Sequence, residues 1–219
     1  MHTRLTCSAS LLTVAFAWTG ALGGFEAAAF AQTPETPPEA PRPRSSLRSQ
    51  EQRMLSLAKL FAKRCQETME GWIDGEEVTQ EQLFSFLYYP VQDTDPPKFS
   101  TDWDELADRD IRDISDDILS KSSAIAFAVL VDRNGYLPAH NRKYSLPLTG
   151  NPAVDLIGNR TKRIFADKTG LAAARNNEAY LLQRYSRDTG ELMQDLSVPV
   201  VIKGEKWGSV RIGYRVVDE

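Results

Sequence analysis

The chain has 219 residues, with 26 lysines and arginines against 30 aspartates and glutamates, and a formal net charge of −4. This mild acidity argues against a nucleic-acid partner, because neutralising phosphates requires clustered lysine and arginine in excess.

Residues 1–31 have the pattern of a signal peptide. Arg4 gives a basic start, Leu5 to Trp18 is largely apolar, and Ala29 to Ala31 has the small-x-small pattern that a signal peptidase recognises. We therefore expect cleavage after Ala31 and a periplasmic or secreted protein. An uncleaved membrane anchor is the alternative, although three glycines and a glutamate interrupt the apolar run that spanning needs.

Residues 32–44 contain five prolines among small and charged residues, a composition that favours an extended linker. We assign residues 45–219 to one sensor domain, with a helical part over 45–121 and a sheet part over 124–217. Cys65 is the only cysteine after the leader, so no intramolecular disulfide can form.

The helical part begins with an amphipathic helix over Leu47 to Trp72, capped by Ser45 or Ser46. Seven apolar residues share one face of it, namely Leu47, Met54, Leu57, Phe61, Cys65, Met69 and Trp72. Cys65 lies in this stripe, so we expect a buried thiol rather than a reactive or intermolecular one.

Two more helices are expected before the sheet. A capping-box pattern at Thr79 to Gln82 starts a helix that Pro90 stops, and Asp93 to Lys98 is typical of a rigid turn. A third helix runs from about Thr101 to Ser120. Its carboxylates are spread round the helix with two arginines among them, which indicates a solvated face rather than a metal cluster.

The pattern changes to that of strands at residue 124. Ile125 to Val131 is a continuous apolar run ending in the turn Asp132 to Gly135, which predicts a central strand and a return strand. Pro138 disrupts pairing, so residues 139–150 are expected to form a loop, with short helical or irregular pieces after it. Strands follow at 180–187, 192–202 and 207–217, and their alternation is typical of a sheet covered on one side.

Several runs of the sheet part resemble the sensory regions of bacterial methyl-accepting chemotaxis proteins. They are the runs 132–138, 140–141, 158–165, 188–191, 195–199 and 207–208, with 89–90 and 97–99 upstream. The element order is also similar to a PAS sheet with the long leading helix of the extracytoplasmic Cache version. The resemblance covers roughly residues 83–214 and implies an α/β fold: a PAS/Cache-like five-stranded antiparallel sheet with a long N-terminal helix and a helical crossover.

The resemblance also implies a sensory function. Only five residues follow Tyr214, so we expect the sensor module without the transmembrane and signalling parts of a receptor. Its expected partners are a small-molecule ligand and a membrane receptor or histidine kinase, and the N-terminal helix is the expected contact of a homodimer or partner.

Six residues are the candidates for ligand binding. Arginine guanidinium groups suit carboxylate or phosphate, and aromatic and neutral donor groups lie near them in sequence. The candidates are Tyr136, His140, Asn141, Tyr144, Arg160 and Arg163. We expect a small anionic metabolite to bind between the sheet and residues 139–165, with no catalytic residue, no resident metal and no cofactor.

His140 also supports two alternatives, because it is the only histidine after the leader. It could be an axial ligand of non-covalent haem in a redox or gas sensor, with Met193 as second ligand; the chain has no Cys-x-x-Cys-His motif for covalent attachment. A hydrolase using His140 is the second alternative, but no Gly-x-Ser-x-Gly elbow or zinc-ligand spacing accompanies it. A purely structural histidine is the remaining interpretation.

Overall fold

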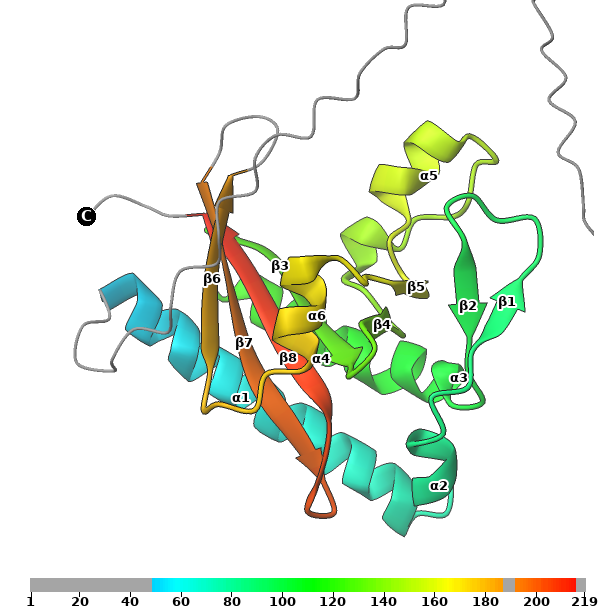
Figure 1. Cartoon of the computed structure of the whole chain (residues 1–219), viewed down its shortest axis with the longest axis horizontal. Helices are drawn as coiled ribbons and strands as arrows, with labels where there is room; N and C mark the ends of the chain where they lie inside the picture. The colour runs from blue at the N-terminus through cyan, green and yellow to red at the C-terminus, as the bar shows by residue number, and fades with distance from the viewer. Residues whose placement is uncertain (1–48, 187–191, 216–219) are drawn as a thin grey trace, which may run out of the picture. The chain divides into compact units, whose positions relative to one another are not determined.

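The computed structural model describes residues 49–186 and 192–215, which form a mixed α/β domain (Figure 1). In this described part, the main sheet has four antiparallel strands in the order β3, β8, β7, β6. They span Ile125–Asp132 for β3, Leu181–Ser186 for β6, Leu192–Ile202 for β7 and Glu205–Arg215 for β8. The three C-terminal strands form the expected meander, and β3 lies at the edge beside β8.

Helix α1, Ser49–Asp74, packs against β7 and β8 on one face of this sheet (Figure 1). Most of the expected apolar stripe is buried there, namely Met54, Phe61, Cys65, Met69 and Trp72, with Leu57 partly buried beside them. Burial raises the pKa of the Cys65 thiol, and the prediction of a buried thiol is confirmed. Leu47 and the candidate caps Ser45 and Ser46 lie outside the described residues.

Both faces of the main sheet are covered, which corrects the prediction of a sheet buried on one side. Helix α6, Lys168–Ala174, packs on β7 and β8 opposite α1 (Figure 1). Asp195 and Ser197 on β7 are therefore as fully buried as Leu196. The polar alternation of this strand marks a buried polar face and not a solvated one.

The prediction of a five-stranded sheet is wrong for the described part of the chain. Tyr136–Leu137 form β4, which lies next to β3 but pairs with β5, Arg163–Ile164, in a separate two-stranded sheet. Side chains of the following loop occupy backbone groups of β3 instead. Asn141 Oδ1 accepts the N–H of Ala128 at 2.9 Å, and the Tyr144 hydroxyl donates to the carbonyl of Ala126 at 3.3 Å.

The second predicted helix is shorter than expected. The capping box at Thr79 is present, but α2, Gln80–Leu83, is a single turn. The chain then forms β1, Tyr89–Val91, which pairs with β2, Lys98–Ser100, across the expected turn.

The third helix is confirmed between residues 104 and 120. It consists of α3, Asp104–Leu106, a π-helical segment η2, Ala107–Ile111, and α4, Arg112–Ser120. The crossover between β4 and β6 contains η3, Arg142–Tyr144, then α5, Pro152–Gly158, then β5 and α6. Within residues 49–186 and 192–215, no helix combines the length and the hydropathy that a membrane span requires.

Candidate functional site

The face of the main sheet opposite α1 carries polar side chains in the protein interior. They are Gln183 on β6, Asp195 and Ser197 on β7, and Ser209 and Arg211 on β8. Arg211 Nε donates to Asp195 Oδ2 at 3.1 Å, and Nη2 donates to the same oxygen. Because a buried carboxylate is stable only when it is paired and hydrogen-bonded, this ion pair organises the centre of the face.

The polar face continues into a small apolar cluster around Phe127. The cluster comprises Phe127, Val129, Val131, Leu137, Phe165 and Ala174. The Phe127 ring lies directly on the backbone of Gly213, where an added Cβ would meet it at 2.1 Å. The guanidinium carbon of Arg211 is 5.9 Å from the centre of this ring, so the polar and apolar halves of the site meet at Phe127.

The backbone of Phe165 is lodged between two glycines. A Cβ at Gly135 or at Gly170 would lie 2.5 Å from the Phe165 carbonyl oxygen, and Gly135 has a φ of +82° that favours glycine. The Phe165 N–H donates to the Gly135 carbonyl at 2.9 Å. These contacts fix the Phe165 backbone, and the guanidinium carbons of Arg160 and Arg163 lie 5.2 and 5.1 Å from the centre of the Phe165 ring.

Several cationic side chains lie close to one another in this region. Burial, and after it the charge of Arg160, lowers the pKa of Arg163, which donates through Nη1 to the Leu156 carbonyl at 3.2 Å. The Lys98 ammonium donates to Asn159 Oδ1 and to the Thr161 carbonyl, both at 2.6 Å. Burial, followed by the charges of Arg163 and Lys162, lowers the pKa of Lys98 to about 8. An anion bound here would relieve this repulsion.

His140 is buried and neutral at the same end of the sheet. Its Nδ1 accepts the Asn141 N–H at 2.8 Å, and its ring centre lies 4.8 Å from that of Tyr144 and 6.4 Å from that of Phe127. Burial lowers the pKa of His140 to about 3, with the charges of Arg160, Lys143, Arg211 and Arg163 as further causes. With Nδ1 as acceptor, the proton of the neutral ring is on Nε2, which is therefore a donor.

The structure places four of the six predicted residues in contact with the Phe127 and Phe165 rings or with their neighbours. His140 lies beside Phe127, Tyr144 packs on His140, and Arg160 and Arg163 lie over Phe165. Asn141 lies next to them but is held by Ala128 and, through Nδ2, by Asp116 at 3.1 Å. Tyr136 lies elsewhere: it packs in the core on the α1 side, and its hydroxyl donates to Asp104 at 2.8 Å.

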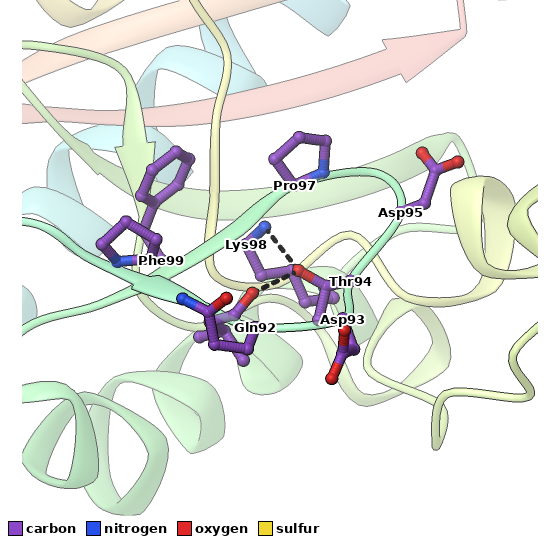
Figure 2. A pocket seen from close by; sticks show the side chains of 9 residues that line it. Gln92, Asp93, Thr94, Asp95, Pro97, Lys98 and Phe99 are labelled. Carbon is purple, nitrogen blue, oxygen red and sulfur yellow. Dashed lines mark hydrogen bonds between the residues drawn. The ribbon is translucent and has the colours of Figure 1, made fainter.

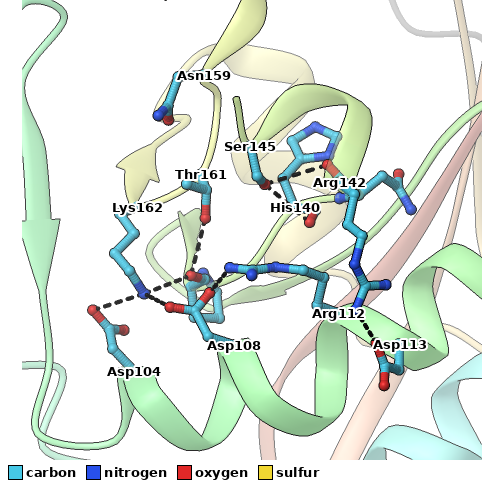
Figure 3. Close-up of polar contacts among 12 residues, drawn as sticks. Asp104, Asp108, Arg112, Asp113, His140, Arg142, Ser145, Asn159, Thr161 and Lys162 are labelled. Carbon is cyan, nitrogen blue, oxygen red and sulfur yellow. Dashed lines mark hydrogen bonds and ion pairs between the residues drawn. The ribbon is translucent and has the colours of Figure 1, made fainter. Parts of the chain in front are cut away.

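The helix from Asp104 to Ser120 binds the crossover loop through its carboxylates, which corrects the prediction of a solvated face in part: Asp104 is buried, whereas the Asp113 side chain remains 64% exposed. Figure 3 shows the Lys162 ammonium between Asp104 and Asp108, at 3.3 and 2.9 Å. Arg142 reaches Asp113 at 2.5 Å (Figure 3). No group of three or more metal-ligating side chains occurs in the part of the chain that the structure describes.

An open pocket of about 340 Å³ lies on the β1–β2 hairpin, lined by residues between Pro90 and Phe99 (Figure 2). None of the six predicted residues lines it. Lys98 borders this pocket, but its ammonium is bonded to Asn159 and Thr161. We therefore place the candidate site at the sheet face, where aromatic rings and paired charges converge.

Sequence reasoning missed Phe127, Phe165, Asp195 and Arg211. The available signal was Asp195, a carboxylate inside a strand with apolar neighbours; the expectation of a sheet covered on one side placed it on the uncovered face. Its partner Arg211 lies on the neighbouring strand, and only the register of β7 against β8 brings the two together.

No protein-family model matches this chain, and no curated protein matches it. Among solved structures, the crystal structure of the PAS domain of an HTR-like protein from Haloarcula marismortui aligns with a TM-score of 0.27 and 14% identity. The alignment covers 46% of this chain and 88% of that one. A similarity this weak assigns neither a ligand nor a partner to this chain.

Proposed function

We propose that this domain is an exported sensory module of PAS or Cache type that captures a small anionic metabolite for signal transduction or chemotaxis. One observation carries the proposal: Arg160 and Arg163 both lie half-buried against the Phe165 ring. Arginine forks beside an aromatic surface suit a ligand with a carboxylate or phosphate and an apolar body. The sequence resemblance to chemoreceptor sensory regions supports the same function.

The hydrogen bonds of His140 favour this function over haem binding. A metal-ligating histidine donates its second ring N–H to an acceptor, whereas His140 Nδ1 accepts an N–H from Asn141. Binding is also favoured over hydrolysis by a Cys65–His140 pair, because Cys65 lies in the α1 core while His140 packs by Phe127 on the other face.

Titration calorimetry against organic acids, amino acids and nucleobases tests the proposal. We expect one class of anion to bind, and Arg160→Ala or Arg163→Ala to weaken it by roughly tenfold or more, since hydrogen bonds to charged groups contribute about 1.5–3 kcal/mol. Arg53→Ala, on exposed α1 surface, is the control. Equal affinity in all three variants would contradict the site.

Two further measurements separate the alternatives. The intact mass of native protein purified from its own periplasm would reveal a retained metabolite. A Soret band after adding haemin that disappears in His140→Ala would instead support the haem sensor.

The signal requires a partner, for which we propose a membrane receptor or histidine kinase. The apolar stripe of α1 lies against the main sheet, so a partner or a second copy would contact the polar side of this helix.

A further inference from the structure

Helix α5 buries its charged side chain and exposes its apolar side chains to solvent. Its one carboxylate, Asp155, is buried and accepts three hydrogen bonds, from the Thr149 N–H at 2.9 Å, the Thr149 hydroxyl at 2.8 Å and the Gly150 N–H at 3.1 Å. The apolar residues Val154, Leu156 and Ile157 point outward, with 50%, 47% and 68% of their surface exposed. A short soluble helix normally has the opposite arrangement.

The loop before α5 extends this apolar surface. Five of the eleven large apolar side chains exposed in the described part of the chain fall within residues 146–157. We call them the apolar patch: Leu146, Leu148, Val154, Leu156 and Ile157. Clustered exposure of this kind marks an interaction surface, whereas single exposed residues need no explanation.

The charges beside the apolar patch are positive in a chain of net charge −4. Residues 142–163 carry five lysines and arginines and one carboxylate, the buried Asp155. Arg142 and Lys162 are paired with carboxylates of the α3–α4 helix. The other cations of this segment are Lys143, Arg160 and Arg163, and Lys143 is exposed.

We propose that the apolar patch docks on the surface of an anionic lipid bilayer. Aliphatic residues that enter the interface, with lysine and arginine beside them, are the composition of interfacial membrane contacts. The energetic hot spots of protein–protein interfaces are instead enriched in tryptophan, tyrosine and arginine, with leucine and valine under-represented, and the apolar patch contains no aromatic residue. A symmetric contact with a second copy would oppose like cations. The proposal goes beyond ligand sensing and does not depend on it.

A fluorophore placed on the patch tests this in the full chain. Ile157→Cys is labelled with an environment-sensitive dye in a Cys7→Ser background, while Cys65 is fully buried and shielded. We expect a blue shift with vesicles of phosphatidylglycerol and phosphatidylcholine, and little shift with phosphatidylcholine alone or at high salt. The combined change Leu156→Ser and Ile157→Ser should weaken vesicle binding by roughly tenfold or more.

Leu60 provides the matched control, since it is 44% exposed on α1. Any binding by residues 1–48 is common to both positions, so only the difference between labels reports on the patch. An equal shift at Leu60→Cys, or no shift at Ile157→Cys, would overturn the proposal. A shift that needs no vesicles and grows with protein concentration would assign the patch to self-association instead and overturn it too.

Discussion

On the face that packs against α1, β7 contributes Leu196, Val198 and Val200 to the large apolar core, whereas on the opposite face the same strand contributes Asp195 and Ser197. Both faces exclude water and both bury polar groups, but the α1 face confines them to one end of β7, where Gln194 Nε2 donates to Glu51 Oε1 at 3.0 Å, whereas Asp195 and Ser197 lie next to each other on the opposite face. Burying polar groups costs stability unless every one is satisfied. On the function proposed above, the α1 face serves mainly stability and the opposite face, with its aromatic rings and arginines, serves recognition.

The largest expected effect on stability comes from breaking the Arg211–Asp195 ion pair of the polar face. Arg211→Met leaves the fully buried Asp195 unpaired, so we expect a loss of about 3–5 kcal/mol in the free energy of unfolding. Adding Asp195→Leu should recover most of this loss, because the unpaired charge is then gone. Urea unfolding of the two variants measures it. A loss below about 1 kcal/mol in Arg211→Met would mean that the pair is effectively solvated.

Leu196→Ala makes the corresponding change on the α1 face. A fully buried leucine is truncated, so we expect a loss of about 2–5 kcal/mol from transfer and cavity terms. Ligand affinity of the remaining folded protein should be unchanged in calorimetry. A change of affinity larger than the change of stability would show that the two faces are not separate.

The pH dependence of stability tests the environment of His140. Its pKa falls from 6.5 to about 3 on folding, so below pH 6.5 the unfolded chain binds a proton that the folded chain does not. Stability is therefore highest above this pH and falls on acidification by up to about 1.4 kcal/mol per pH unit. Urea midpoints between about pH 6.5 and 5 should show this slope, and His140→Gln should flatten it. An unchanged slope in the variant would place the imidazole in solvent.

The smallest expected effect on stability is at Ser197, the neighbour of Leu196 in β7. Its buried hydroxyl finds no hydrogen-bond partner among the described residues, so Ser197→Ala should change stability by less than about 1 kcal/mol in either direction. If a ligand forms a hydrogen bond with this hydroxyl, Ser197→Ala lowers the affinity for that ligand without lowering stability. A large loss of stability would show that the hydroxyl is already satisfied within the fold.

Local patterns predict much of the fold. The strand predicted over residues 192–202 forms β7 with the same bounds, and the capping box at Thr79 starts a helix. The fifth strand failed because the side chains of Asn141 and Tyr144 occupy backbone groups of β3. The spacing of apolar residues cannot reveal that side chains, and not a neighbouring strand, bond to the backbone of β3.

The site could be predicted only where its residues are close in sequence. His140 and Tyr144 lie in one loop, and Arg160 and Arg163 in one segment, so their proximity could be inferred. Asp195 meets Arg211 only because of the register of β7 against β8. Tyr136 lies apart from the other candidate residues because the chain turns to the α1 side of the sheet after β3.

The close packing of the Phe165 backbone between Gly135 and Gly170 restricts the movement of the segment that carries Arg160 and Arg163. Since the Phe165 carbonyl has no free space on either side and its N–H is bonded to Gly135, residues 160–165 cannot shift without displacing the turn that follows β3. That turn is tied through Asp132 to the Tyr88 hydroxyl, at 2.5 Å, beyond the sheet. On the proposed binding of an anion by Arg160 and Arg163, these contacts form a continuous connection from the ligand to the segment that precedes β1.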